Sequence, residues 1–588
     1  MAQEMIDAQD KVIAGAAIGA PKRRLTTVLD GQRTRSEAAA APITSVTSYH
    51  SQRDEIARRE STLSFDYRTT ATASAKEKHV NAIIQAVKAQ DKIAVYDAAE
   101  PRLGWGGQKH PRFPADHFLS NVDLIEKTEL FSIAQKMPKG AHLHIHFNAC
   151  LKPDVLLGIA KERKRMFITS DLPLARGGAI SQEAADIALH RCEIQFSILG
   201  PGKEHEKQGT GNCFSPQYAE RQWMKYSQFL DEFPGHHNGQ DPDEWLASKL
   251  LFHEEEAHNH LQTVQGSWAK FNGRTRMMKG LFNYESAYRK YTRGILEDFQ
   301  RDNIQYAEIR PNFMPSNQLW TDDGVKTIDN HGIMEIIIQE YIKFQAGNKD
   351  KFVGLKVIYC TPRSFKNEQV AQALAQCLEF KQKWPEWIAG FDLVGEESQG
   401  RPLRDFVPEF LEFKENCKSA KGGPYDIPFL FHCGETLEVG NDTDGNLLDA
   451  LLLGSKRIGH GFALARHPYI MEHMKKNGVC LELCPISNEE LGLTPRVTGH
   501  AMYNLLANNV HCTLNSDNGT IFRSSLSHDF YQAMVGKTNM TLYGWKQLIE
   551  WSLDHSCMSK VELESAVEDW KRRWEEFLDW VIEEYGGN

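Results

Sequence analysis

Short apolar runs alternate with helical patterns along most of the chain. The first run, Ala141–Phe147, is followed by seven others bounded by turn residues. These runs span Ile304–Pro311, Phe352–Cys360, Ile388–Gly395, Ile427–Glu435, Lys456–Gly461, Gly478–Pro485 and Val510–Asp517. Helical segments, such as Asn367–Trp384 and His467–Asn477, lie between them. Alternating strands and helices predict an α/β protein with a parallel sheet, and eight such units predict a closed (β/α)₈ barrel of the TIM type.

The N-terminal part differs from this pattern. Residues 1–45 are rich in Ala, Thr, Ser and Arg without periodicity, which predicts a poorly ordered arm. Residues 46–135 form a predicted helical unit. Its apolar residues recur at three- and four-residue spacing, at Val80, Ile83, Ile84 and Val87. Pro101–Phe118, rich in Gly and Pro, is predicted to be a linker.

Residues 136–588 are predicted to form the barrel and its C-terminal helices. The distance between the first two strands, from Phe147 to Ile304, is far longer than one crossover helix needs. We therefore expect an insertion after the first strand, at about residues 170–257.

The charge, the N-terminal residues and the cysteines argue against a nucleic-acid-binding protein, a secreted protein and a disulfide-rich protein. The net charge of −10 gives no reason to expect nucleic acid or an anionic membrane as a partner. Acidic residues stand near the N-terminus where a secretory signal would be positive, so we expect a cytoplasmic protein. The eleven cysteines are scattered, which is not typical of a disulfide framework. Cys480 and Cys484 are expected to pack in the core.

Polar residues that suit chemistry stand at the predicted strand ends. His142, His144 and His146 alternate along the first strand and therefore share one face. The fifth, sixth and eighth runs end in His432, Glu435, His460, Asp517 and Asn518. Because the carboxyl ends of barrel strands form the active site, we expect these residues to converge.

Three imidazoles and a carboxylate suit a catalytic Zn²⁺ with an open position for water. The metal would lower the pKa of this water and so generate a nucleophile at neutral pH. Glu435 would carry a proton beside the metal, and His460 would orient or deprotonate the water. The zinc signature of the cytidine-type deaminases, H-x-E with P-C-x-x-C, is absent from the sequence.

Six motifs, in order, carry a family resemblance: MPKGAHLHIH, FDLVG, FHCGET, RIGHGFAL, ELCPISN and LNSDNGTIF. From about residue 46 to the C-terminus the chain resembles the adenosine deaminase family. The MPKG motif, the long insertion and the helical N-terminal unit resemble its branch of adenosine-deaminase-related growth factors. In that branch the helical unit helps to build a homodimer, which we expect here.

The resemblance also implies roles for single residues. It implies one Zn²⁺ per chain, held by His144, His146, His432 and Asp517. It assigns proton transfer at purine N1 to Glu435, the attacking water to His460, and a backbone N–H at purine N3 to Gly395. His142 occupies a position that is usually apolar in the family, so we expect it to pack or to support the ligands.

Two positions depart from the family pattern. Asn518 stands where the family usually has an Asp that donates a hydrogen bond to purine N7, and an Asn amide also donates there. Asn148 stands where other members have an Asp that contacts the ribose. The segment Val394–Gly400 also differs from the usual sequence of the branch. These differences concern the recognition of the base and the sugar.

We therefore predict zinc-dependent deamination of adenosine or 2′-deoxyadenosine to inosine or 2′-deoxyinosine and ammonia. Glu435, His460 and Asp517 would be catalytic, and Gly395, Asn518 and Asn148 would bind the purine nucleoside. One alternative is a nucleotide resembling AMP, or an N6-substituted purine, at the same metal site. A nucleotide would need Arg or Lys near the sugar, and the sequence does not place Arg363 or Lys139 there. The other alternative is a catalytically weak signalling or binding protein.

Overall fold

The structure, a computed structural model, describes residues 42–587 except 105, 177–180, 204–211, 216, 219, 349 and 350. The predicted N-terminal arm, residues 1–45, therefore lies almost wholly outside the described residues. The chain separates into two compact units, residues 1–63 and 64–588. In the first unit, helix α2 (Val46–Thr62) begins at a capping box formed by Ser45 and Ser48, and it has no buried residue.

All eight predicted strands are present in the second unit. The first four are β3 (Ala141–His146), β7 (Tyr306–Arg310), β10 (Gly354–Pro362) and β11 (Ile388–Val394). They form one parallel sheet in the order β11-β10-β7-β3. The second parallel sheet, in the order β12-β13-β14-β15, contains β12 (His432–Cys433), β13 (Arg457–His460), β14 (Cys480–Leu483) and β15 (Cys512–Leu514). The prediction of an α/β fold is confirmed.

The two sheets are linked to each other at both ends. Isolated parallel bridges join Ile145 to Asp517 and Phe391 to Phe429. At the first link, the His146 backbone N–H donates to the Asp517 carbonyl over 3.0 Å. Strand β12 is shorter than the predicted run Ile427–Glu435. The residues before it still bond to the neighbouring strands, since the Leu430 backbone N–H donates to Phe391 and the Gly459 backbone N–H donates to Phe431.

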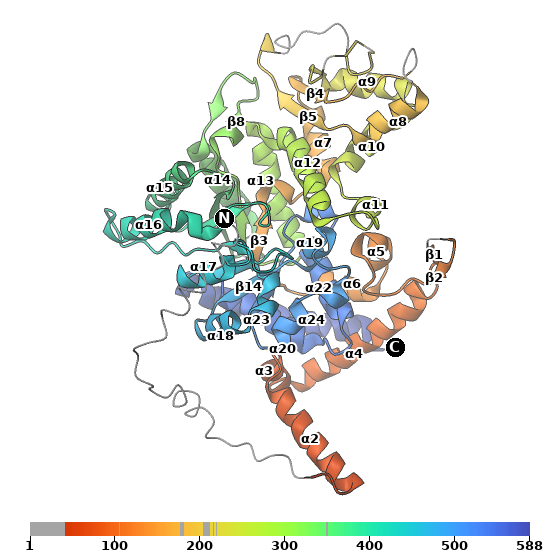
Figure 1. Cartoon of the computed structure of the whole chain (residues 1–588), viewed down its shortest axis with the longest axis vertical. Helices are drawn as coiled ribbons and strands as arrows, with labels where there is room; N and C mark the ends of the chain where they lie inside the picture. Colours follow the sequence, from red (N-terminus) through yellow and green to blue (C-terminus); the bar gives the residue numbers. More distant parts are fainter. Residues whose placement is uncertain are drawn as a thin grey trace, which may run out of the picture. The chain divides into compact units, whose positions relative to one another are not determined.

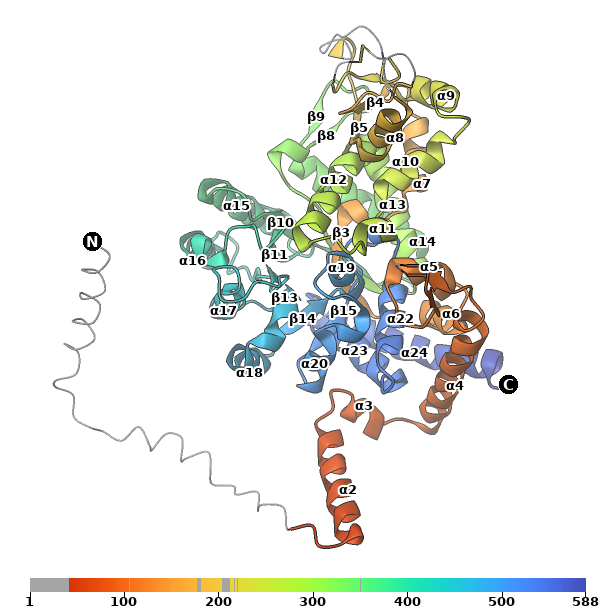
Figure 2. The ribbon, with the colours of Figure 1, turned by 45° about the vertical axis from the view of Figure 1, so that its right-hand side comes forward.

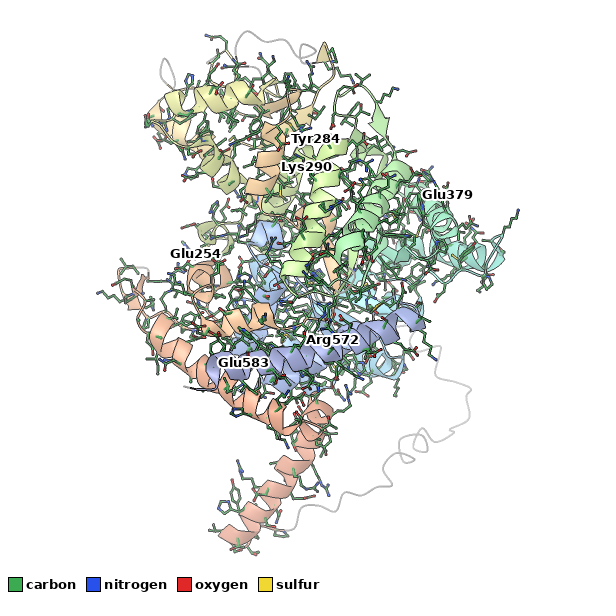
Figure 3. All side chains as sticks on the ribbon, turned by 180° about the vertical axis from the view of Figure 1, so that it is seen from behind. Glu254, Tyr284, Lys290, Glu379, Arg572 and Glu583 are labelled. Carbon is green, nitrogen blue, oxygen red and sulfur yellow. The ribbon has the colours of Figure 1, made fainter. Side chains whose placement is uncertain are left out.

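Helices follow the parallel strands, as Figures 1 and 2 show. They are α13 (Glu285–Arg301), α14 (Asn330–Asn348), α15 (Asn367–Lys383), α16 (Val407–Ser419), α17 (Asn446–Leu452), α18 (Pro468–Lys476) and α20 (Met502–Ala507). The predicted helices at 367–384 and 467–477 correspond to α15 and α18. The C-terminal helices are α22 (Leu526–Gly536), α23 (Leu542–Asp554) and α24 (Lys560–Tyr585). Figure 3 labels Arg572 and Glu583 along α24.

The segment between α2 and β3 is mostly helical. It contains α3 (Tyr67–Ala71), α4 (Ala75–Asp91), the π-helical turn η1 (Lys92–Tyr96), α5 (Phe118–Ile125) and α6 (Glu129–Lys136). The predicted linker Pro101–Phe118 instead contains a short antiparallel pair, β1 (Arg102–Leu103) and β2 (Lys109–His110). Helix α4 buries Val80, Ile83 and Ile84, and it packs against α24.

The chain between β3 and β7 folds into several elements. They are η2 (Phe147–Ala149), α7 (Pro153–Lys161), β4 (Met166–Ser170), α8 (Gln182–Arg191), β5 (Ile194–Ile198), β6 (Met224–Lys225), α9 (Tyr226–His236), α10 (Pro242–Leu250), α11 (Glu254–Ala257) and α12 (Val264–Phe282), followed by α13. Strands β5, β4 and β6 form an antiparallel sheet of their own. Figures 1 and 2 show β4, β5, α8 and α9 gathered at one end of the second unit, whereas α12 reaches toward the parallel strands.

Two further features of the described residues concern the helices and the cysteines. None of the helices within the described ranges is both long and apolar enough to cross a membrane. All eleven cysteines are free thiols, and Cys480 and Cys484 are buried.

Candidate active site

Four of the predicted residues meet at the carboxyl ends of the parallel strands. His144, His432, His460 and Asp517 are buried, and one potential ligand atom of each lies within 4.8 Å of the others. His146 lies beside this group. Its Nε2 is 3.2 Å from Asp517 Oδ1 and 3.3 Å from His432 Nε2. The strand ends therefore bring together every side chain that the family pattern assigns to the metal.

Two of these histidines are oriented by buried carboxylates. Glu482 accepts a hydrogen bond from His144 Nδ1 over 2.7 Å, and Asp392 accepts one from His432 Nδ1 over 2.7 Å. The Asp392 carboxylate also accepts the His432 backbone N–H over 2.9 Å. Because each Nδ1 carries a proton toward its carboxylate, each Nε2 presents a lone pair to the site.

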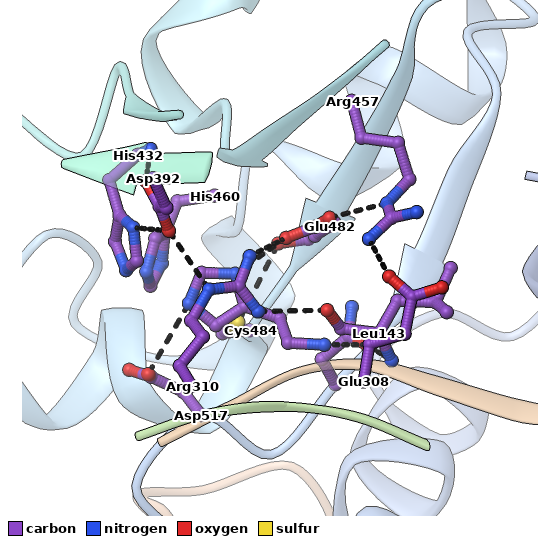
Figure 4. Close-up of polar contacts among 12 residues, drawn as sticks. Leu143, Glu308, Arg310, Asp392, His432, Arg457, His460, Glu482, Cys484 and Asp517 are labelled. Carbon is purple, nitrogen blue, oxygen red and sulfur yellow. Dashed lines mark hydrogen bonds and ion pairs between the residues drawn. The ribbon is translucent and has the colours of Figure 1, made fainter. Parts of the chain in front are cut away.

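The two carboxylates belong to a buried ion network that Figure 4 shows. Arg310 donates to Asp392 over 2.9 Å and to Glu482 over 2.7 Å. Arg457 connects Glu482 to Glu308, with 2.5 Å to each. The His432 imidazole and the Arg310 guanidinium help to hold the pKa of Asp392 below its usual value, against the effect of burial. The network therefore keeps both histidine-orienting groups ionised.

Sequence reasoning did not identify these five charged residues. Each of them stands within a predicted strand, for example Glu308 and Arg310 in YAEIRP. A charged side chain inside a strand that is buried on both faces needs a partner. This rule could have indicated that the five residues form ion pairs, although it does not specify which of them pair.

A chain of hydrogen bonds fixes the protonation of His460. The Met502 backbone N–H donates to His500 Nδ1 over 2.9 Å, so His500 Nε2 carries the proton that Asn488 Oδ1 accepts over 3.0 Å. The Asn488 amide then donates to His460 Nδ1 over 3.0 Å. His460 Nδ1 is thus an acceptor, and its Nε2 carries the proton.

Glu435 is held beside His460. Its backbone N–H donates to Glu397 over 2.6 Å, and its Oε1 lies 3.4 Å from His460 Nε2. Burial, with the nearby charges of Asp517 and Glu397, raises the pKa of Glu435 well above its usual value. A carboxyl group with a raised pKa is suited to hold and deliver a proton.

Asp517 and His460 are also held in strained backbone conformations. Their φ angles are 56° and 61°, in the left-handed region that residues other than Gly rarely adopt. Ser487, in helix α19 (Pro485–Glu490), donates to Asp517 Oδ2 over 2.7 Å. Such strain costs about 1–3 kcal/mol per residue and concentrates at functional sites.

A pocket opens over these groups. Its lining includes the three predicted substrate residues, Gly395, Asn148 and Asn518. Gly395 has φ 104°, a conformation that favours Gly. Asn518 is the N-cap residue of α21 (Gly519–Phe522), but its side chain makes no capping hydrogen bond and is buried. The lining also includes Val394, from the segment that departs from the branch pattern, and residues that sequence reasoning missed, namely Trp268, Phe271, Thr275, Asn312 and Leu491.

The three other basic candidates lie outside the pocket lining. His142 accepts from the Ser516 backbone N–H over 3.1 Å, and burial lowers its pKa to about 3. Lys139 is buried and donates to the Asp302 carbonyl over 2.7 Å. Arg363 is buried and donates to the His432 carbonyl over 2.6 Å.

Comparison with known proteins identifies the family. The adenosine deaminase family model matches residues 249–570. The chain belongs to this family. An adenosine deaminase of Phlebotomus duboscqi is 31% identical over 514 residues, which cover 86% of this chain and 87% of that protein. Adenosine deaminase 2 of Pongo abelii is 30% identical over 475 residues, which cover 79% of this chain and 83% of that protein. The chain is thus a metal-dependent aminohydrolase of the adenosine deaminase type.

Solved structures support the fold. The structure of an ADAL–IMP complex aligns with a TM-score of 0.51 and 15% sequence identity, covering 76% of this chain and 99% of that one. The family-model match begins after β3, so it does not include His144 and His146. Tertiary structure brings these two residues to His432 and Asp517.

Proposed function

We propose that this enzyme hydrolyses adenosine or 2′-deoxyadenosine to inosine or 2′-deoxyinosine and ammonia. One observation carries the proposal. Glu435 and the group of His144, His432, His460 and Asp517 converge beneath a single pocket. The names of the relatives agree with this reaction.

The residues at the strand ends fit a Zn²⁺ ion. His144 Nε2 and Asp517 Oδ1 are buried and have no hydrogen-bond partner among the described residues. Because buried polar atoms need a partner, this fits a role of both atoms as ligands of a cation. His144, His146, His432 and Asp517 would hold the ion, a nitrogen and oxygen donor set that zinc prefers. Bound zinc supplies a Lewis acid and lowers the pKa of water, so that a nucleophile is available at neutral pH.

His460 has a different role from the other histidines. A ring nitrogen that carries a proton has no lone pair for a metal, and His460 carries its proton on Nε2, toward the pocket. We therefore assign His460 to orienting the attacking water through this N–H. Of the two roles considered from sequence, the hydrogen bonds favour orientation over deprotonation.

Glu435 is the proton donor in the proposed reaction. As the water oxygen bonds to purine C6, the Glu435 carboxyl group delivers its proton to N1, and the proton that the water loses returns to Glu435. The C6–N bond then breaks, the amino group takes the proton of the new hydroxyl group and leaves as ammonia, and the 6-oxo purine remains. The backbone N–H of Gly395 would bind purine N3, and the Asn518 amide would donate to N7. Asn148 would face the sugar.

The pocket favours a nucleoside over a nucleotide. Among its described lining residues there is no Lys or Arg to bind a phosphate. Of the two basic residues considered from sequence, Lys139 donates to the Asp302 carbonyl and Arg363 to the His432 carbonyl, and neither is among these lining residues. This lining, which lacks Lys and Arg among its described residues, gives no support to a substrate resembling AMP.

We also propose that the two parallel sheets form one closed (β/α)₈ barrel. The bridges at Ile145–Asp517 and Phe391–Phe429 support closure at both seams. In this arrangement the eight carboxyl ends face a common site. The residues from 46 to 135 would form a dimerisation unit, and the segment at about 170–257 would be an insertion.

A substrate panel tests the proposal. Purified enzyme is incubated with adenosine, 2′-deoxyadenosine, AMP and an N6-methylated adenosine, and the release of ammonia or methylamine is measured. We expect the highest kcat/KM for a nucleoside, and we expect His144→Ala to lose activity and the zinc ion of the active site. Faster turnover of AMP, or full activity after complete removal of metal, would contradict the proposal. A lack of turnover with every substrate would favour a binding or signalling protein.

A further inference from the structure

Two histidines and two glutamates form a second polar cluster, which the proposed reaction does not use. His117 precedes α5, His258 follows α11, and Glu489 and Glu490 end α19. One potential ligand atom each of His117, His258 and Glu489 lies within 4.8 Å of the others. Glu490 Oε2 lies 3.3 Å from His258 Nε2, and Glu489 Oε1 lies 3.8 Å from His117 Nδ1.

The two carboxyl groups are buried without adequate partners. Glu489 is 2% exposed and Glu490 is 0% exposed. Glu489 Oε1 accepts from the Phe118 backbone N–H over 2.7 Å, but its Oε2 has no hydrogen-bond partner among the described residues. Both carboxyl oxygens of Glu490 also lack a hydrogen-bond partner among the described residues, apart from a weak interaction with the Leu119 backbone N–H. Buried carboxyl groups of this kind need a cation or a proton.

His258 does not provide the missing positive charge. Burial lowers the pKa of His258 to about 4, so its imidazole is neutral at physiological pH. The His117 and His258 rings stack with their centroids 3.9 Å apart. Burial raises the pKa of Glu489 to about 7 and that of Glu490 to about 8. A neutral imidazole and carboxyl groups that can lose a proton are suitable metal ligands.

We propose that His117, His258, Glu489 and Glu490 form a second Zn²⁺ site. Ligands about 2.0–2.2 Å from a tetrahedral zinc lie about 3.3–3.6 Å apart, close to the two separations above. Two imidazole nitrogens favour zinc over Ca²⁺ or Mg²⁺, which prefer oxygen ligands. Binding requires a rotation of the His117 ring, the more exposed of the two, so that both ring planes contain the ion.

This ion would join three segments that are distant in sequence. Helix α5 precedes the first parallel strand, and α11 lies between β3 and β7, where Glu254 marks its first turn in Figure 3. Helix α19 also carries Ser487 and Asn488, which hold Asp517 and His460. The second zinc would therefore fix the helix that positions two catalytic groups, without taking part in the chemistry.

Metal stoichiometry tests this proposal without relying on activity. Zinc per chain is measured by mass spectrometry after dialysis against buffered Zn²⁺. We expect two ions for the wild type, one for the isosteric variant Glu490→Gln, and one for His258→Ala. The exposed neighbour His260 offers a matched control, because His260→Ala should keep two ions.

The two sites can be separated by variants. His144→Ala should also hold one ion, and the double variant His144→Ala/Glu490→Gln should hold none. Retention of one ion by Glu490→Gln shows that this variant is folded. Saturation of the wild type at one ion, or two ions in both Glu490→Gln and His258→Ala, would overturn the second site and leave the catalytic site unaffected.

Discussion

His144, His432 and His460 carry the same side chain but have different neighbours at Nδ1. A carboxylate accepts from Nδ1 of the first two, whereas an amide donates to Nδ1 of the third. The Nε2 atoms that face the site are therefore lone-pair donors in His144 and His432 and a hydrogen-bond donor in His460. At this scale, the tautomer distinguishes a proposed metal ligand from a residue that orients water.

The variant Glu435→Gln tests proton transfer. The amide preserves the shape of the side chain but cannot deliver a proton, so kcat should fall at least about 100-fold while zinc stays bound. Steady-state kinetics and metal analysis measure the two effects. Glu438→Gln is a matched control outside the pocket lining and should retain wild-type kcat. If Glu435→Gln lost its zinc but kept normal turnover per bound metal, its assigned role would be wrong.

The Asn518 amide tests recognition of the base. It has no capping bond, so purine N7 is its proposed partner. A stranded buried donor costs about 1–3 kcal/mol. We therefore expect 7-deazaadenosine to have a kcat/KM roughly 10- to 100-fold below that of adenosine in the wild type. Asn518→Ala should remove most of this difference, and Asn508→Ala, an exposed control, should retain it. If the ratio of kcat/KM for adenosine to kcat/KM for 7-deazaadenosine were the same in the wild type and in Asn518→Ala, the contact between Asn518 and purine N7 would be rejected.

At the scale of elements, four parallel strands contribute charges to one network. Strand β7 supplies Glu308 and Arg310, and β11 supplies Asp392. Strand β13 supplies Arg457, and β14 supplies Glu482. Each charge compensates its neighbour in a region closed to water, and the two central carboxylates orient the histidines. The strands therefore supply both the walls of the site and the orientation of its ligands.

Arg310→Ala tests the stability that this network provides. Removal of the guanidinium leaves Asp392 and Glu482 with an uncompensated buried charge, so the free energy of unfolding should fall by about 3–5 kcal/mol. Denaturant unfolding measures the loss. Arg572→Ala removes exposed ion pairs on α24 and should cost at most about 1 kcal/mol. Equal losses in the two variants would show that the buried network contributes no special stability.

At the scale of the whole molecule, the expected homodimer remains a prediction. Helix α2 has no buried residue and exposes Val46, Tyr49 and Ile56 at 74%, 46% and 61%. Exposed apolar side chains at helical spacing favour burial against a partner. We expect light scattering to give the mass of two chains at concentrations where the enzyme is active.

Substitution can locate that interface. Tyr49→Glu with Ile56→Glu should shift the protein to single chains, because the charges oppose burial of this face. Val561→Glu, at a position that is 76% exposed on α24, is the control and should leave the mass unchanged. A single-chain mass for the wild type would contradict dimerisation.

The sequence by itself determined the order and type of the elements in the parallel core. Alternation of apolar runs and helical patterns is a local property, so helices such as α15 and all the parallel strands except the short β12 could be predicted to within a few residues. The alternation of His144 and His146 placed both on one face of β3, since successive side chains of a strand point to opposite faces. The motifs were sufficient to name the family.

Only the tertiary structure decided which residues interact. The Arg310 network, the hydrogen bonds from His500 through Asn488 to His460, and the contribution of Trp268 to the pocket all join segments far apart in the chain. Periodicity carries no information about such pairs, because they depend on the register and packing of whole elements. For the same reason, the cluster of His117, His258, Glu489 and Glu490 is visible only once α5, α11 and α19 have come together.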